Sequence, residues 1–304
     1  MNDGALTFAG GPIQAESFSR FERILFTTDF SETSLNVLPA AGAVARTFGS
    51  SLTLMYVLTP GDEICAAPEF APAIRDVVET DANARLLALK YSAQLEGVNA
   101  NAEVYKGGWN NLIDKIASDN IDLLVLSTHG NQGFRHLLLG SMAEDMTHSV
   151  TCPVLTVGPH AKWSTGNEFR PKHILFATDA TADSFRVLPY ALEFAKAQYA
   201  NIALLHVLPG GKEESPDADA FAALMRDLLH RKLSLAEIKN ISPEIVVKFG
   251  NVKDEILNAA QERGSELIVM GARSKTKRGT FSRSVSYGVI SSATCPVLTV
   301  RGTP

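Results

Sequence analysis

The sequence has few cysteines and no long hydrophobic run. Three cysteines, Cys65, Cys152 and Cys295, occur among 304 residues, too few and too scattered for a disulfide framework or a cysteine-based zinc site. This usage fits the reducing cytoplasm, where we expect the protein to act. No apolar run approaches the ~20 residues of a membrane helix. Residues 1–20 lack the basic and apolar segments of a signal peptide, so we expect a loose tail there.

Several patterns of nucleotide-binding and catalytic sites are also missing. No Gly-x-x-x-x-Gly-Lys-Ser/Thr segment occurs, no Gly-x-Gly-x-x-Gly follows a strand, and there is no Ser-Gly-Gly-x-Asp-Ser loop. Neither metal ligands nor a nucleophile with its base are found at a readable spacing. A net charge of -5 argues against nucleic acid as the main partner. We therefore expect no catalytic residue and no dedicated metal site.

What the sequence does contain is two copies of one unit. Residues 24–40 recur as residues 174–190, and Cys-Pro-Val-Leu-Thr-Val occurs at 152–157 and again at 295–300. We therefore predict one domain at 21–159, a linker at 160–172 and a second domain at 173–304. Each copy is long enough to bury a core of its own.

Both copies alternate short apolar runs with segments of helical periodicity. The predicted strands are 23–27, 51–58, 101–105, 121–126, 153–157, 173–178, 201–208, 243–249, 266–270 and 296–300. The predicted helices are 34–48, 72–96, 110–118, 141–150, 218–239 and 254–263. This alternation predicts the α/β class, with parallel sheets covered by helices on both faces. Such sheets bind ligands beyond the carboxyl ends of their strands, where Asp29 and Ser127 should converge.

One stretch of the first copy has the features of a phosphate site. Residues 123–126 are continuously apolar, as in a strand buried on both faces. Gly130 and Gly140 then bracket nine residues, and Ser141 with Glu144 makes a capping-box pattern. Glycine N–H groups and a helix N-terminus could together cradle a phosphate. Alternatively, Gly140 only permits a turn and Ser141 only caps a helix.

These residues resemble the motif of the universal stress protein family, which is Gly, two residues, Gly, nine residues, Gly, then Ser or Thr. Ser127 replaces the first glycine, and the rest of the register is kept. The resemblance extends from about residue 23 to residue 300. It implies two tandem Rossmann-like domains of the adenine nucleotide alpha hydrolase-like type. It also implies a five-stranded parallel sheet of order 3-2-1-4-5 in each, and a pseudo-dimer through the fifth strands.

The resemblance further implies an ATP site in the first copy. Its residues would be Thr27, Thr28, Asp29, Val57, Ser127, His129, Gly130, Arg135, Gly140, Ser141, Met142 and Ala143. Asp29 would hold the adenine–ribose end, and Val57 would lie against the adenine ring. The residues themselves leave alternatives open: an Asx turn for Asp29, which Asp179 repeats, and a core position for Val57. His129 and Arg135 could contact phosphates or be solvated loop residues.

The second copy departs from the motif. Ser274 stands where the first copy has Gly130, and alignment of the two Cys-Pro-Val runs places Arg283 against Gly140. An arginine side chain there should fill the space of a phosphate, so we expect one nucleotide per chain. The basic run 275–278 could hold another anion or be a solvated charge run.

Two functions from different classes are consistent with these observations. The first is an ATP-binding regulatory protein of the stress response, with Mg²⁺ bound through the phosphates and at most slow ATP hydrolysis. The second is a ligand-sensing or partner-interaction module of the same fold that uses no nucleotide. For either, we expect an intrachain pseudo-dimer and a homodimer, without nucleic acid or membrane partners.

Overall fold

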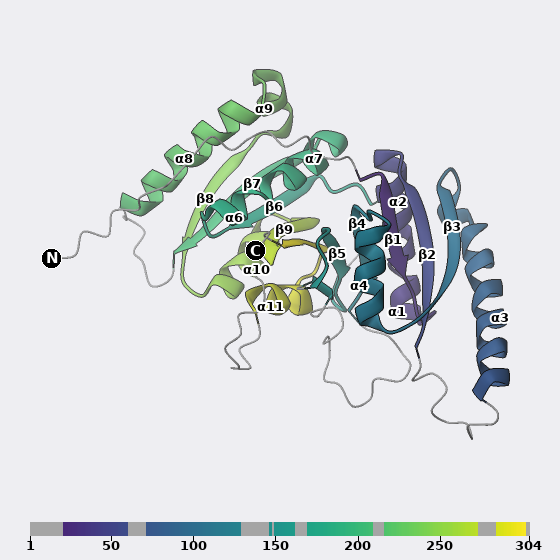
Figure 1. Cartoon of the computed structure of the whole chain (residues 1–304). Helices are drawn as coiled ribbons and strands as arrows, with labels where there is room; N and C mark the ends of the chain where they lie inside the picture. Colours follow the sequence, from purple (N-terminus) through teal and green to yellow (C-terminus); the bar gives the residue numbers. More distant parts are fainter. Residues whose placement is uncertain are drawn as a thin grey trace.

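The computed structural model describes residues 21–59, 71–128, 146–147, 149–161, 169–208, 216–272 and 284–301. Figure 1 shows one long twisted sheet with helices on both faces. Its first half contains β1 (Arg23–Thr27), α1 (Glu32–Leu35), α2 (Leu38–Phe48), β2 (Ser51–Leu58), α3 (Ala71–Lys90), the 3-10 helix η2 (Ala93–Leu95), β3 (Asn99–Lys106), α4 (Trp109–Ser118), β4 (Leu123–Ser127) and β5 (Val154–Val157).

The second half repeats this order. It contains β6 (His173–Thr178), α6 (Ala182–Phe185), α7 (Leu188–Gln198), β7 (Asn201–Leu208), α8 (Pro216–Lys232), α9 (Leu235–Ile241), β8 (Glu244–Phe249), α10 (Val252–Glu262), β9 (Leu267–Ala272), α11 (Val285–Ser292) and β10 (Val297–Arg301). All ten predicted strands are present, and β1, β2, β6 and β7 have the predicted bounds. The α/β class is confirmed.

The predicted strand order is confirmed in each half. The full sheet runs β3-β2-β1-β4-β5-β10-β9-β6-β7-β8, so both halves follow the order 3-2-1-4-5 with parallel neighbours. The two sheets are also continuous, because β5 and β10 pair antiparallel, with Leu155 opposite Leu298. The pseudo-dimer through the fifth strands is therefore present within one chain.

Three of the predicted helices differ from the structure. The helix expected at 34–48 is two helices, because Pro39 lies in the first turn of α2, where its missing N–H leaves no hydrogen bond unmade. The helix expected at 72–96 ends at Lys90 and is followed by η2. The helix expected at 218–239 is broken at Ser234, which starts α9 with a capping box to Glu237. Most of the predicted helix at 141–150 lies outside the described residues.

The two faces of the sheet are packed differently. On one face a single core cluster spans both halves and includes Phe26, Leu86, Phe176 and Phe194. On the other face each half has a cluster of its own. The shared face is where α2 meets α7: the ring centroids of Phe48 and Phe194 lie 5.2 Å apart. The halves are therefore joined by a common core as well as by a strand pair.

Further close contacts connect the two halves, between α2 and α7 and around the β5–β10 strand pair. Gln198 Nε2 donates to Thr47 Oγ1 at 2.7 Å, and Arg301 Nη1 donates to the carbonyl of Ser149 at 3.0 Å. A Cβ atom on Gly158 would lie 2.4 Å from the carbonyl oxygen of Ile290, so only glycine permits this approach of β5 to α11. Within the described ranges, no helix is long and apolar enough to cross a membrane.

Candidate functional site

The predicted site residues that the structure describes lie at one edge of the sheet. β1 and β4 are neighbours in register, and they end at Thr27 and Ser127. The direction in which the chain adds strands to the sheet reverses at this pair, since β2 lies on the far side of β1 and β5 lies on the far side of β4. This is the topological switch point of a doubly wound sheet, where such folds bind ligands. The predicted convergence of the segments after β1 and β4 is therefore present.

Thr28 fixes the turn that comes after β1. Its N–H donates to the carbonyl of Met55 at 2.9 Å, which continues the pairing with β2. Its Oγ1 accepts a hydrogen bond from Phe30 N at 2.9 Å and lies 2.9 Å from Ser34 Oγ. Thr27 and Thr28 are both buried. Thr28 therefore holds the turn in place from within the structure.

Asp29 makes an Asx turn. Its Oδ1 accepts from Ser31 N at 3.0 Å and from Ser31 Oγ at 2.6 Å. Ser31 is in turn the N-cap of α1 and accepts from Ser34 N at 3.2 Å. The carboxylate is half-buried at the sheet edge. The structural alternative for Asp29 is thus confirmed, while its contact with a nucleotide stays a prediction.

The second half builds the same turn. Asp179 Oδ1 accepts from Thr181 N at 3.1 Å and from Thr181 Oγ1 at 2.6 Å. Thr178 Oγ1 lies 2.7 Å from Ser184 Oγ, as Thr28 lies beside Ser34. The residues after the aspartates, Phe30 and Ala180, both have a φ of 61°. The turn therefore forms in a half whose motif is incomplete.

Val57 belongs to the core of the first half. It is 7% exposed and packs in a cluster with Met55, Leu126 and Met146. Its partner across the strand pair is Tyr105 of β3. This placement is that of a core valine near the carboxyl end of β2. Contact with an adenine ring remains a prediction.

Ser127 is the last residue of β4 and lies opposite Val157 of β5. Thr128 continues the pairing, since its N–H donates to the carbonyl of Val157 at 3.2 Å. The other predicted site residues lie outside the described residues: His129, Gly130, Arg135, Gly140, Ser141, Met142 and Ala143. The phosphate part of the predicted site therefore stays a prediction.

In the second half, a capped helix begins at the end of the corresponding loop. Ser284, aligned with Ser141, is the N-cap of α11 and accepts from Tyr287 N at 3.2 Å. Arg283 lies outside the described residues. The alignment therefore places a serine cap at the start of a helix, as predicted for the first half.

A feature at the same edge was missed from the sequence. Gly107 and Gly108 lead from β3 into α4, and Gly108 is the N-cap without a side-chain cap. The Tyr105 ring covers Gly107, where an added Cβ would lie 3.1 Å from Cε1. Within the described residues, the buried Nε1 of Trp109 has no hydrogen-bond partner. The Gly-Gly pair between a predicted strand and a predicted helix was the available signal.

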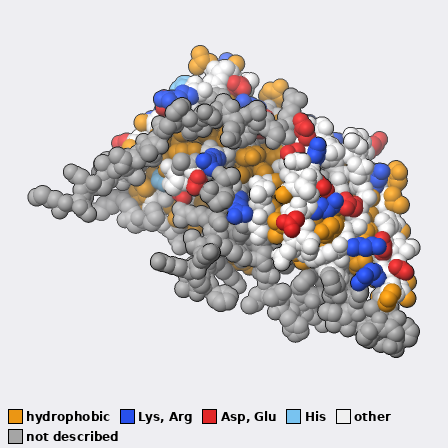
Figure 2. Space-filling model, in the orientation of Figure 1, with side chains coloured by type: hydrophobic (Ala, Val, Ile, Leu, Met, Phe, Trp, Pro, Cys, Tyr) orange, Lys and Arg blue, Asp and Glu red, His pale blue; other side chains and the backbone are white. Residues whose placement is uncertain are grey.

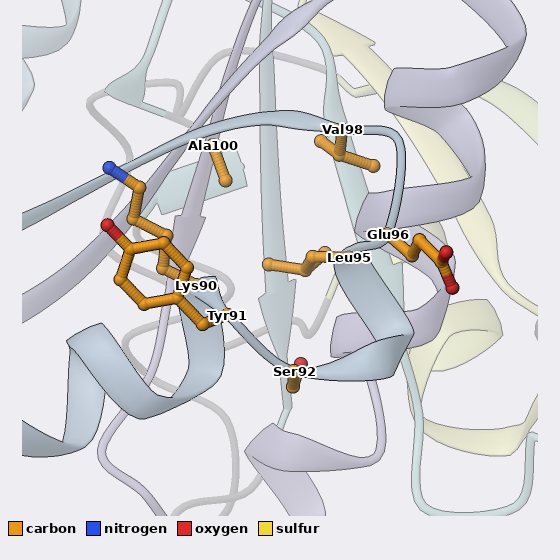
Figure 3. A pocket seen from close by; sticks show the side chains of 7 residues that line it. All are labelled: Lys90, Tyr91, Ser92, Leu95, Glu96, Val98 and Ala100. Atoms are coloured by element: carbon orange, nitrogen blue, oxygen red, sulfur yellow. The ribbon is translucent and has the colours of Figure 1, made fainter.

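Among the residues that the structure describes, there is no reactive thiol and no preformed cluster of metal ligands. Cys152 and Cys295 are free and buried, and burial raises the pKa of each thiol to about 12. No group of three or more His, Cys, Asp or Glu in the described part of the chain is arranged to hold a metal ion. A hollow of about 490 Å³ lies elsewhere, beside the start of β3, and is lined by residues that include Lys90, Tyr91 and Glu96 (Figure 3).

Fold and switch-point geometry together define a tandem protein with two α/β units of the doubly wound type. The model of the universal stress protein family matches residues 20–158 and 171–301. The chain therefore belongs to the universal stress protein family, with one family unit in each half.

Relatives with known names support this assignment. A universal stress protein of Methanocaldococcus jannaschii is 27% identical over 139 residues, which are 45% of this chain and 82% of that protein. Universal stress protein G of Shigella flexneri is 32% identical over 120 residues, 36% of this chain and 83% of that protein. A solved universal stress protein from Archaeoglobus fulgidus matches with a TM-score of 0.67 at 20% identity, covering 93% of this chain and 97% of that one. At this identity the last match shows the fold alone.

Proposed function

We propose that this universal stress protein binds one ATP per chain, in its first half, and acts as a regulator in the stress response. The observation that carries the proposal is the register Ser127, Gly130, Gly140, Ser141, which begins at the last residue of β4. That position is the β1/β4 switch point, and the Asp29 turn comes after the neighbouring strand. Glycine N–H groups and a capped helix start would bind the phosphates, and Asp29 would bind the ribose.

A second candidate function is supported by the turn at Asp179. This turn repeats the geometry of Asp29 in a half that lacks the two loop glycines. An aspartate at this point is therefore explained without a ligand. The second candidate is a sensor or interaction module of the same fold that uses no nucleotide.

One experiment separates the two candidates. Protein purified without added nucleotide is denatured, and the supernatant is analysed by chromatography for adenine nucleotides. Titration calorimetry of nucleotide-free protein then gives the number of sites. We expect one ATP site per chain. Two equivalent sites would contradict the assignment to the first half, and no binding would favour the second candidate.

We also propose that Mg²⁺ strengthens ATP binding. The predicted cradle consists mainly of neutral backbone donors, and the positive charges near it in the sequence are Arg135 and, when protonated, His129 and His136. Mg²⁺ is commonly held by phosphate oxygens and waters with little protein ligation, so no cluster of acidic residues is required. ATP affinity measured with and without a chelator tests this. Equal affinity in both would remove the metal from the proposal.

Hydrolysis is expected to be slow. Phosphoryl transfer to water needs an oriented water molecule and positive charge at the transferred group. No glutamine, glutamate or arginine of the sequence can be assigned to these roles. Phosphate release at saturating ATP should therefore fall well below the ~1–100 s⁻¹ of kinases. Turnover in that range would reveal a catalytic residue.

The reducing cytoplasm is the proposed location. Cys152 and Cys295 are both free in the structure, and each lies buried next to a proline at the start of a central strand. Fractionation of cells that express the tagged full chain tests the location.

A further inference from the structure

Arg85 belongs to α3, the helix that lies beside the edge strand β3 (Figure 1). Figure 2 shows charged side chains mixed with hydrophobic ones along the right-hand side of the molecule, where α3 lies. The Arg85 side chain is 48% exposed, yet two groups hold its guanidinium. Its Cζ lies 4.2 Å from the ring centroid of Phe30, and its Nη1 lies 3.7 Å from Asp81 Oδ2. A cation of α3 is therefore placed over a ring of the turn that comes after β1.

The Phe30 ring connects α3 with the sheet. Phe30 is buried and also stacks on Tyr56 of β2, with ring centroids 5.2 Å apart and an angle of 13° between the ring planes. A guanidinium over an aromatic ring is attracted by the negative charge of the ring face. One side chain of the turn thus contacts both β2 and α3.

Phe30 follows Asp29, whose carboxylate is the proposed ribose ligand. The N–H of Phe30 donates to Thr28 Oγ1 at 2.9 Å, and the residue has a φ of 61°. On the other side of Phe30, the N–H of Ser31 donates to Asp29 Oδ1 at 3.0 Å. A ring held in the stack fixes the Cα–Cβ bond of Phe30. Through the adjoining peptide, it also limits the directions in which the Asp29 side chain can leave the backbone.

The second half shows that this turn forms without such a stack. Ala180 stands at the position of Phe30 with the same φ of 61°, and Asp179 keeps its hydrogen bonds. There the ring beside the strand comes from the helix itself, since Phe221 of α8 stacks on His206 of β7 with ring centroids 4.6 Å apart. Ala180 has no ring, so that stack does not include the turn. The first half therefore has a connection from helix to turn that the turn does not need in order to form.

We propose that Arg85 is a positioning residue for the ATP site of the first half, and that it acts through Phe30 on the carboxylate of Asp29. This inference rests on the proposed function. The stack occurs in the half that carries Gly130 and Gly140, and the other half lacks both the stack and these glycines. A carboxylate that is already held in its binding orientation loses less conformational entropy when the ligand binds, which increases affinity.

The test is calorimetric titration of the nucleotide-free full chain with ATP. Loss of a cation–π contact at an exposed site corresponds to a roughly two- to fivefold change in an equilibrium constant. Arg85→Met keeps the length of the side chain and removes its charge, so it should raise the Kd of ATP by about this factor. Arg85→Lys keeps a cation that can lie over the ring, and it should restore most of the affinity. Equal losses in both variants would overturn the proposal.

A double-mutant cycle tests whether Arg85 acts through Phe30. Phe30→Leu keeps an apolar side chain and removes the ring, so it should weaken ATP binding by itself. In the Phe30→Leu background, Arg85→Met should have no further effect, because the cation has no ring to hold. An arginine that contacts the nucleotide directly would instead weaken binding equally in both backgrounds, and that result would overturn the proposal. Should Phe30→Leu not fold, the contrast between Arg85→Met and Arg85→Lys still decides.

The second half offers a matched control. Arg231 of α8 makes the same kind of ion pair four residues along its helix, with Asp227 at 2.8 Å between Nη2 and Oδ2. Arg231→Met should leave the Kd of ATP unchanged. Urea unfolding without ATP checks that every variant is folded at the temperature of the titration. If the wild type and Arg85→Met bind ATP equally, this inference fails and the proposed function stands. If the wild type binds no ATP, both fail.

Discussion

The two halves of the chain build the same aspartate turn with different residues around it. In the first half, Phe30 comes after Asp29; its ring stacks on Tyr56 at 5.2 Å, and Arg85 lies over it at 4.2 Å. In the second half the turn has Ala180, which carries no ring to stack. The backbone geometry is nonetheless common to both. The turn is therefore a structural element of the unit, and it forms with or without a ring after the aspartate.

The largest expected effect is on that loop. Gly140→Arg gives the first half the residue that the second half already has at the aligned position, Arg283. The arginine side chain should occupy the phosphate space, so ATP affinity measured by calorimetry should fall more than a hundredfold. The melting temperature should change little, because the second half folds with an arginine there. Arg283→Gly is the matched control and should leave one site per chain. Unchanged affinity in folded Gly140→Arg would place the phosphates elsewhere.

Replacing the residue after each aspartate by glycine should have opposite effects. A φ of 61° is strained for any residue with a Cβ, by about 1 kcal/mol. Ala180→Gly should therefore stabilise the protein slightly, by up to about 1 kcal/mol. Phe30→Gly also loses a buried ring and its stack, which costs about 3 kcal/mol or more and outweighs the relief of strain. Urea unfolding of both variants measures this. Equal losses in both halves would show that the backbone, not the stack, dominates.

Removing the two carboxylates separates structure from binding. Asp29→Ala and Asp179→Ala each remove two hydrogen bonds to the cap residue two positions on, so each should lower the free energy of unfolding by about 1–2 kcal/mol. Only Asp29→Ala should weaken ATP binding as well. If both variants bind ATP as the wild type does, Asp29 serves the turn alone.

The sequence was most informative where a residue's effect is local. The bounds of β1, β2, β6 and β7 were predicted from apolar runs that are followed by polar residues or proline, and the Asx turn at Asp29 involves neighbours two residues away. The predicted pairing of the fifth strands also holds, because both are apolar and would otherwise leave an edge open.

The errors arose where two local signals competed. The periodicity of residues 34–48 and 218–239 favours one helix each, yet Pro39 and the Ser234–Glu237 box start new helices within them. In both cases the residue that starts the new helix overrides the apolar spacing, because it sets where the helix can begin. The phosphate loop is different, because residues 129–145 lie outside the described residues, and its role rests on the sequence motif.

The smallest effect concerns the capping box at the start of α9. The N–H and hydroxyl of Ser234, with Lys196, lower the pKa of Glu237 from 4.5 to about 2. A lowered pKa in the folded state stabilises the protein above about pH 4.5, and this contribution is lost as the pH falls toward 2. Ser234→Ala should cost about 1 kcal/mol at pH 7. In Glu237→Gln, stability should fall less steeply than in the wild type between these pH values. Identical slopes in thermal melts would show that the box does not titrate.

The antiparallel joint of β5 and β10 has a consequence for how the halves can diverge. Because both halves are on one polypeptide, their association is intramolecular and does not depend on protein concentration. Each half always meets the other half and not a copy of itself, so the joint does not require the two to be alike. The antiparallel pairing also points the carboxyl edges of the two halves in opposite directions. One edge can therefore keep a ligand while the opposite edge changes freely.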